Sequence, residues 1–247
     1  MKITILLLTT LLTLMNSKSF KSEQKRYPRV REAYAEKEQG IKDLLKSKNI
    51  KIENLEVYLR AFKNDKKIQL WGKNKCDQKF KLIKEYKICR SSGRLGPKRK
   101  QGDFQVPEGF YHIDRFNPYS NFHLSLGINY PNTSDKILGV KGKLGGDIFI
   151  HGSCVTIGCM PITDDQIKEL YLFCVEAKNN GQNTIPVTIF PTVLIKKNYD
   201  FLLEKYKSDK DKTDLWKELK LAYDLFNKNK TIPKIQFLKN GGHLISK

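Results

Sequence analysis

A histidine and a cysteine enclose one short loop near the middle of the chain, which reads HGSCVTIGC from His151 to Cys159. Cysteine acts as a nucleophile in its thiolate form, and a neighbouring imidazole is the usual group that generates thiolate near neutral pH. This pair predicts nucleophilic catalysis, with Cys159 as the attacking group and His151 as the base. If the two side chains pair in this way, we expect the pKa of the Cys159 thiol to lie below its ordinary value of about 8.5.

Small residues within the loop predict how it could hold a substrate. Gly152, Ser153, Thr156 and Gly158 allow the backbone to approach a substrate carbonyl closely. The backbone N–H groups of Gly158 and Cys159 could then bind the oxyanion that forms when that carbonyl is attacked. We therefore expect Gly152, Thr156 and Gly158 to support the loop and its oxyanion site.

The segments on either side of the loop indicate how it is positioned. The apolar run 148–150 is typical of a buried strand. Thr163 and Gln166 have the spacing of a helix capping box, and apolar residues recur at helical intervals over 164–178. Cys174 lies on that apolar face and is expected in the core. The histidine thus leaves the end of a strand, and the cysteine is presented just ahead of a helix.

The pattern His-Gly-x-Cys-x-(Ser/Thr)-x-Gly-Cys resembles the signature of the YkuD-type L,D-transpeptidases, in a YafK-like branch. The resemblance implies that Cys159 is the nucleophile, that His151 is the base, and that 156–158 form the Ser/Thr-x-Gly element before the cysteine. It also suggests that a backbone carbonyl near Gly152 orients the imidazole, in place of the third member of a catalytic triad. Many family members carry a second histidine where this chain has Ile157, and they separate the two halves of the motif by a longer insert.

The resemblance implies a fold class that is mainly β with flanking helices (α+β), built on a YkuD-like sandwich or barrel of mixed strands. It further implies an exported cysteine acyl-transferase that acts on peptidoglycan stem peptides and requires no cofactor. Cys159 would attack the carbonyl of the L-centre of a diamino acid and expel the terminal D-residue, while His151 would take the thiol proton and later activate the acceptor.

The nature of the acceptor separates the alternatives that the sequence leaves open. An amine would give a cross-link or the attachment of a wall protein, so a wall-attached protein is a candidate partner. Water would give hydrolysis, which makes a cysteine hydrolase of peptidoglycan or wall-protein linkages the main alternative. An inactive wall-binding module is a third interpretation, disfavoured because both His151 and Cys159 are present.

The same residues could instead form a metal site or a disulfide. His151, Cys154 and Cys159 could bind zinc, with His112 or His123 as a fourth ligand. Structural zinc sites usually add a second ligand pair with C-x2-C spacing, which this chain lacks, so we predict no metal. A disulfide between Cys154 and Cys159 would silence the nucleophile. We interpret Cys154 as a small buried residue that supports the loop, and both histidines as ordinary residues of predicted strands.

The cysteine count leaves the disulfide pattern open. The chain has five cysteines, and in an exported protein an odd number leaves at least one thiol unpaired within the monomer. Cys159 is our candidate for the free thiol. Cys76 and Cys89 could form a bridge within one hairpin region, but the connectivity of Cys76, Cys89, Cys154 and Cys174 cannot be read from their spacing.

The chain is strongly basic, with 46 Lys and Arg against 26 Asp and Glu and a formal net charge of +20. A basic surface suits nucleic acid, anionic lipid or an anionic wall polymer. We find no DNA- or RNA-binding motif, and the N-terminus indicates export, so nucleic acid is not an expected partner. A lysine-rich surface that only confers solubility explains the charge equally well.

The N-terminus predicts a signal peptide over 1–19. Lys2 precedes the apolar run 3–15, and the small residues Ser17 and Ser19 follow. The run is too short to span a bilayer comfortably, and no cysteine stands near the cleavage point to carry a lipid. We therefore expect an exported protein of the periplasm or cell envelope, with no stable membrane anchor after cleavage.

The remaining chain divides into an N-terminal helical extension (20–54), a catalytic domain (55–195) and a C-terminal helical appendage (196–247). The extension contains an amphipathic pattern over 28–48, and the appendage carries an apolar stripe typical of a helix.

Within the catalytic domain, runs at 57–62 and 68–71 predict a β-hairpin. Further strands are predicted at 122–128 and 186–191. Asp135 is predicted to lie in a Gly- and Lys-rich loop.

Overall fold

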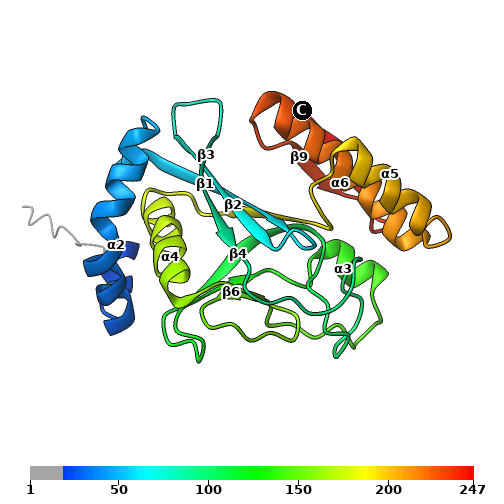
Figure 1. The fold of residues 1–247 in the computed structure, drawn as a ribbon, viewed down its shortest axis with the longest axis horizontal. Helices are drawn as coiled ribbons and strands as arrows, with labels where there is room; N and C mark the ends of the chain where they lie inside the picture. The colour runs from blue at the N-terminus through cyan, green and yellow to red at the C-terminus, as the bar shows by residue number, and fades with distance from the viewer. Residues whose placement is uncertain (1–18) are drawn as a thin grey trace, which may run out of the picture.

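A computed structural model describes residues 19–247, so the predicted signal peptide lies outside the described residues except for Ser19. Figure 1 shows how the helices and strands are arranged. The helices are α1 (Phe20–Gln24), α2 (Pro28–Ser47), η1 (Ile52–Asn54), α3 (Thr133–Leu138), α4 (Asp164–Asn179), α5 (Lys196–Lys205) and α6 (Lys210–Asn229). The strands are β1 (Leu55–Phe62), β2 (Lys67–Asn74), β3 (Lys81–Lys87), β4 (Gly109–Asn117), β5 (Ser125–Ile128), β6 (Phe149–His151), β7 (Met160–Pro161), β8 (Ile185–Phe190), β9 (Lys234–Phe237) and β10 (His243–Ser246).

One curled sheet of eight strands forms the body of the molecule, in the order β3-β2-β1-β8-β4-β5-β6-β7. β1 and β2 form the predicted antiparallel hairpin, whose last pair is Phe62 with Lys67. β1 then pairs in parallel with β8, and β8 pairs antiparallel with β4. The mainly β fold with flanking helices is therefore confirmed, and all the core strands belong to one mixed sheet.

Both faces of the central strands are buried, and β1 shows how the sequence achieves this. Val57 and Leu59 belong to the main core cluster together with the apolar face of α4. Tyr58 and Phe62, which point to the other face, pack with residues of α6 instead. Because side chains alternate along a strand, apolar residues at successive positions are needed where helices cover both faces. In Figure 1, α4 lies on one side of the sheet, while α5 and α6 lie on the other.

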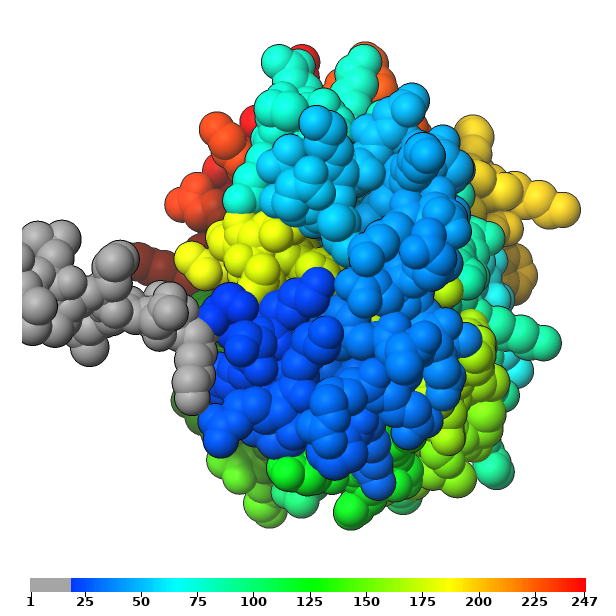
Figure 2. All heavy atoms as spheres, turned by 90° about the vertical axis from the view of Figure 1, so that its left-hand side faces the viewer, coloured from blue at the N-terminus to red at the C-terminus, as the bar shows by residue number. Residues whose placement is uncertain are grey.

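The N-terminal helices pack on the outside of α4 and cover that face of the molecule, in blue in Figure 2. The predicted helix 28–48 is confirmed as α2, which begins at a proline in its first turn. Its residues Val30, Ala33 and Ile41 are almost completely buried in the main core cluster. The Tyr34 hydroxyl donates a 2.8 Å hydrogen bond to Glu176 of α4. The extension therefore shares its core with the sheet.

The C-terminal appendage is only partly helical, so the prediction of an all-helical segment over 196–247 is wrong. α5 and α6 are followed by an antiparallel hairpin, in which β9 pairs with β10 from Phe237–His243 to Lys234–Ser246. The turn between the strands contains Asn240 and Gly241, and Gly241 has a φ of 87°, a conformation that favours glycine. Ile245 of the hairpin is buried in the cluster that α5 and α6 form with β1, β4 and β8.

A buried arginine joins the appendage to the sheet. Arg60 of β1 is 2% exposed, and its guanidinium donates a 3.0 Å hydrogen bond to the side chain of Asn227 in α6. Its Cζ atom lies 4.6–6.0 Å from the centres of five aromatic rings, those of Phe62, Trp71, Phe190, Tyr223 and Phe226. Cation–π contact with these rings offsets part of the free energy needed to remove the charge from water.

Two local predictions near the active-site loop are wrong. The strand predicted at 122–128 begins only at Ser125, because His123 has a φ of 69° and cannot continue a strand. Asp135, predicted in a loop, lies in the first turn of α3. Its carboxylate accepts from the Asn132 backbone N–H at 3.1 Å, while the Asn132 side chain accepts from the Asp135 N–H at 2.9 Å. This reciprocal capping box starts a short helix. Over residues 19–247, no helix has the length and apolar character needed to cross a bilayer.

Candidate active site

His151 stands at the end of β6, where three strands fix its backbone. It pairs with Ser125 of β5 on one side and with Pro161 of β7 on the other. Its ring lies 4.6 Å from the ring of Phe122, centre to centre, and the residue is 1% exposed. The Nδ1 atom lies 2.5 Å from the carbonyl oxygen of Gly152. A carbonyl can only accept, so Nδ1 carries the proton and Nε2 carries the lone pair. The carbonyl of Gly152 therefore orients the imidazole, as the family resemblance implied.

The turn after His151 requires a glycine because it packs directly against α4. A Cβ atom on Gly152 would lie 2.5 Å from an Asp164 side-chain oxygen and 2.8 Å from the Phe122 carbonyl oxygen. The same Asp164 oxygen accepts a 2.7 Å hydrogen bond from the Ser153 N–H. The close approach that Gly152 permits is therefore to the protein itself, at the start of α4. That helix begins as predicted, with the Thr163 hydroxyl accepting from the Gln166 N–H.

A disulfide between Cys89 and Cys154 ties the loop to the segment that follows β3. It excludes two bridges that the sequence left open, Cys76–Cys89 and Cys154–Cys159. Cys154 is also exposed, where a small buried residue was predicted. Cys76, Cys159 and Cys174 are free, and Cys174 is fully buried on α4 as expected. The bridge leaves the Cys159 thiol available for chemistry.

The surroundings of Cys159 favour the neutral thiol over the thiolate. Its Sγ atom lies 3.6 Å from the carbonyl oxygen of Asp147, to which the thiol donates. Burial raises the pKa of Cys159, and the negative charge of Asp147 adds to this effect. Among the described residues, no hydrogen bond joins His151 to Cys159. The prediction that His151 lowers the pKa of this thiol is therefore wrong for the resting state. Burial also lowers the pKa of His151, which favours the neutral imidazole.

The two N–H groups expected to bind an oxyanion are already engaged. Those of Gly158 and Cys159 both donate to the Thr156 hydroxyl oxygen, at 3.1 Å and 2.9 Å. That hydroxyl in turn donates to the Cys159 carbonyl at 2.8 Å. Thr156 thus supports the loop as predicted, but it does so by occupying the donors assigned to the oxyanion. Gly158 has a φ of 140°, and a Cβ atom there would lie 3.2 Å from the Gln105 carbonyl oxygen.

Cys159 borders a pocket of about 370 Å³ between the loop and two other segments, 98–104 and 145–148. The Gln101 N–H donates a 2.7 Å hydrogen bond to the carbonyl of Lys143, which holds the first segment against the residues just before the second. Phe104 and Ile157, 55% and 76% exposed, give the pocket apolar walls. An accessible thiol beside an apolar pocket can attack a bound acyl group.

Several residues of this site were not predicted from the sequence. Phe122 contacts the His151 ring, Asp147 accepts from the thiol, and Asp164 holds the loop at the start of α4. Asp164 stands directly after a predicted helix cap, which was the one available signal. Asp147 lies in a loop without a motif, and its proximity to Cys159 follows only from the folded chain.

The zinc alternative does not fit these residues, because Cys154 is bonded to Cys89 and cannot act as a thiolate ligand. Across the part of the chain that the structure describes, no group of three His, Cys, Asp or Glu side chains is arranged to hold a metal ion.

Comparison with known proteins shows the family of this domain. Residues 56–189 match the family model described as the YkuD L,D-transpeptidase catalytic domain. The chain belongs to this family. The match runs from β1 to the end of β8, so it contains both His151 and Cys159, and it leaves the C-terminal helices and hairpin outside.

A curated relative of this YkuD-family chain is the Escherichia coli K12 protein named "Putative L,D-transpeptidase YafK". It is 36% identical over 193 residues, which cover 77% of this chain and 74% of the relative. Among solved structures, the chain is similar to the helical cell shape determining protein Pgp2 from Campylobacter jejuni. The identity is 20% and the TM-score 0.44, over 75% of this chain and 73% of that one. Bd1075 from Bdellovibrio bacteriovorus is also similar, at 21% identity and a TM-score of 0.41, over 72% of this chain and 75% of that one.

Proposed function

We propose that this YkuD-family protein is an exported cysteine acyl-transferase that acts on peptidoglycan stem peptides. The observation that carries the proposal is the loop 151–159, which starts at an oriented neutral imidazole and ends at a free thiol on the wall of a pocket. Relatives named as L,D-transpeptidases support the substrate class.

In the proposed reaction, His151 acts as a general base when the thiol attacks. Both groups are neutral at rest, since burial raises the pKa of Cys159 and lowers that of His151. Proton transfer from sulfur to Nε2 therefore accompanies formation of the bond between sulfur and the carbonyl carbon of the L-centre. The bond to the terminal D-residue then breaks, and its amine leaves with the proton from His151. An acceptor amine, deprotonated by His151, resolves the thioester and restores the thiol.

The oxyanion formed in this reaction needs donors that Thr156 now occupies. Rotation of the Thr156 hydroxyl away from the loop would free the N–H groups of Gly158 and Cys159 together, because one oxygen accepts from both. The hydroxyl oxygen marks a point at which two N–H groups converge, which is the arrangement an oxyanion requires.

Unpaired basic side chains near the pocket support an acidic peptide substrate. Lys100, Lys141 and Lys143 are exposed within or just before the two segments that flank Cys159, and none of them forms an ion pair with another described residue. Stem peptides carry free carboxylates, which these ammonium groups would attract at long range. The predicted signal peptide supports a location in the periplasm or cell envelope, where this substrate occurs.

The test is turnover of a tetrapeptide donor by the purified protein, with and without a diamino-acid acceptor, followed by mass spectrometry. We expect cross-linked product in the presence of acceptor and an acyl-enzyme mass on the peptide that contains Cys159. Cys159→Ala should abolish both, whereas Cys76→Ala, which removes an exposed thiol remote from the loop, should leave both unchanged. Tripeptide alone at saturating acceptor would show that water resolves the thioester and that the enzyme is a hydrolase. Undiminished turnover in Cys159→Ala would refute the proposed nucleophile.

A further inference from the structure

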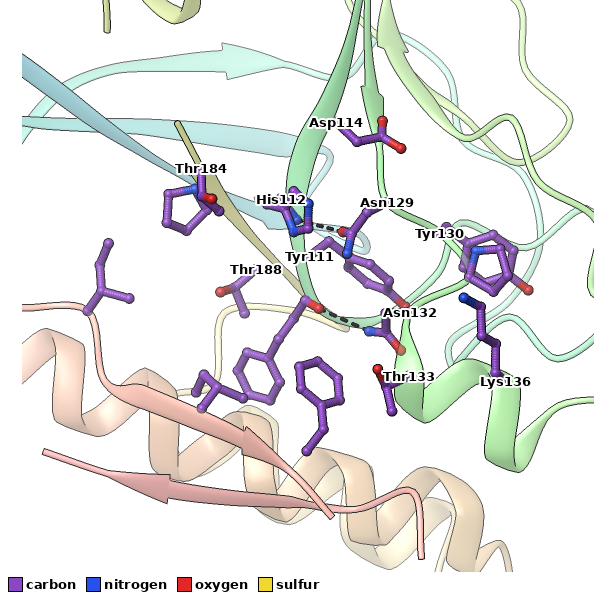
Figure 3. A pocket seen from close by; sticks show the side chains of 16 residues that line it. Tyr111, His112, Asp114, Asn129, Tyr130, Asn132, Thr133, Lys136, Thr184 and Thr188 are labelled. Carbon is purple, nitrogen blue, oxygen red and sulfur yellow. Dashed lines mark hydrogen bonds between the residues drawn. The ribbon is translucent and has the colours of Figure 1, made fainter. Parts of the chain in front are cut away.

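A second pocket, of about 610 Å³, lies between the sheet and the C-terminal hairpin (Figure 3). Its walls come from β4, β8, the turn before α3, and β9. None of its lining residues borders the Cys159 pocket. The proposed acyl transfer thus leaves both this pocket and the hairpin that closes it without a role.

The hairpin supplies the apolar wall of the pocket. Ile235 and Phe237 project from β9, Ile232 precedes the strand, and Phe110 of β4 completes this side. Phe237 is 36% exposed, and its ring is fixed by an edge contact with His243 at 4.8 Å. A partly exposed aromatic ring held in place offers a flat apolar surface at little cost in side-chain entropy.

The opposite wall carries polar groups that lack partners. Among the described residues, the imidazole of His112 and the hydroxyl of Thr184 form no hydrogen bond, and both lie at the pocket in Figure 3. The Asn129 side-chain oxygen accepts a 2.8 Å hydrogen bond from the backbone N–H of His112, which fixes the Asn129 amide and leaves its NH₂ group free. These three side chains offer both donors and acceptors to a ligand.

The pocket is nearly uncharged although the chain carries a net charge of +20. Its lining includes two residues with permanently charged side chains, Lys136 and Asp114, and the carboxylate of Asp114 is paired with Arg115 at 3.2 Å. A binding site for a polyanion is lined by several Lys or Arg side chains, whereas the lining of this pocket includes one, Lys136. The ligand that fits is neutral, bears several hydroxyl or amide groups, and has an apolar face.

We propose that this pocket binds an N-acetylated sugar of the wall glycan strand, an inference that rests on the proposed wall substrate. The hydroxyl and amide groups of a 2-acetamido sugar match the polar wall, while its C–H face and acetyl methyl match Phe237 and Ile235. Tyr130 connects this site to the first. Tyr130 lines this pocket, and its hydroxyl oxygen lies 3.4 Å from the carbonyl oxygen of Lys98 and 3.2 Å from that of Leu144, so its one proton is shared between two acceptors next to the Cys159 pocket. The glycan site would thus hold the strand whose stem peptide enters the neighbouring pocket.

The test is calorimetric binding of N,N′,N″,N‴-tetraacetylchitotetraose, a soluble chain of 2-acetamido sugars, to the full chain. Phe237→Ala should weaken binding about tenfold, the amount expected for loss of one stacked ring. Leu244→Ala is the matched control, since Leu244 is 54% exposed on the partner strand of the same hairpin and does not line the pocket. Thr184→Trp should abolish binding by filling the pocket from the polar side, without altering the hairpin.

The readouts separate this inference from the proposed function. Cys159→Ala should bind the sugar normally, and Phe237→Ala should process a free tetrapeptide normally while losing activity on glycan-linked peptide. Absence of peptide turnover with intact, Phe237-dependent sugar binding would refute the proposed function alone. The glycan site is overturned if the sugar does not bind, if it binds equally to Phe237→Ala and Thr184→Trp, or if free stem tetrapeptide displaces it.

Discussion

Removing the Cys89–Cys154 disulfide should destabilise the protein strongly, because the bond closes a long loop. The two cysteines are 65 residues apart in the sequence. In the loop-entropy model, a bridge of that length destabilises the unfolded chain by roughly 4 kcal/mol at 25 °C, and native disulfides commonly contribute about 2–5 kcal/mol. The double variant Cys89→Ser/Cys154→Ser should therefore lose about 4 kcal/mol in its free energy of unfolding.

The assay is equilibrium urea unfolding of oxidised protein, followed by tryptophan fluorescence. With an m-value of about 2–3 kcal/mol/M, a loss of 4 kcal/mol moves the midpoint down by about 1.5 M. Cys76→Ser is the control, since Cys76 is exposed and unpaired. Peptide mapping without reduction should recover residues 89 and 154 in one linked fragment. A midpoint change no larger than that of Cys76→Ser, or a fragment linking 154 to 159, would refute the reasoning.

Three further results are expected. Gly152→Ala should cost about 1–3 kcal/mol in urea unfolding and reduce turnover, because the added methyl overlaps the start of α4. Gly146→Ala, with no atom within 4 Å of the added methyl, should match the parent protein in urea unfolding. Burial raises the pKa of Asp135 to about 6 from an ordinary 3.8, so the stability due to this carboxyl is complete below pH 3.8 and is lost as the pH rises through 6. Relative to Asp135→Asn, the parent should lose about 2.5 kcal/mol between pH 4 and pH 7, and a constant difference in unfolding free energy would contradict this. Iodoacetamide alkylation of Cys159 can be followed by mass spectrometry, with the exposed Cys76 as internal reference. Its pH midpoint should lie above about 8.5, because burial raises the pKa of this thiol. A lower midpoint would instead support an imidazole–thiolate pair.

The sequence predicted those parts of the site that depend on neighbouring residues. The capping pair at Thr163 and Gln166 starts α4 where expected, and the Gly152 carbonyl orients His151. The capping pair lies three positions apart, so local spacing is sufficient to indicate it, whereas the orientation of His151 was implied only by the family resemblance. The β1–β2 hairpin was predictable for the same reason, because its strands are separated by a short polar turn.

Contacts between distant segments could not be read from spacing. Cys89 meets Cys154 only because the chain after β3 passes the loop, as the hydrogen bond from the Cys89 N–H to the Pro161 carbonyl shows. The raised pKa of Cys159 likewise follows from burial by the segments around Asp147 and Lys98. The C-terminal hairpin was predictable in part, since Asn240 and Gly241 lie between two β-prone runs. The strong helical pattern that precedes the hairpin favoured a helix over the whole segment.

The central pairing of the sheet also determines when this chain is able to fold. Tyr58 of β1 and Thr188 of β8 share a 2.8 Å hydrogen bond, although they lie 130 positions apart along the sequence. At a synthesis rate of about 5–20 residues per second, β1 waits on the order of 10 s for this neighbour to leave the ribosome. Until then β1 lacks the strand with which it pairs in the middle of the sheet. Non-local pairings of this kind form slowly even in a complete chain. The central pairing of the sheet therefore cannot form until most of the polypeptide has left the ribosome.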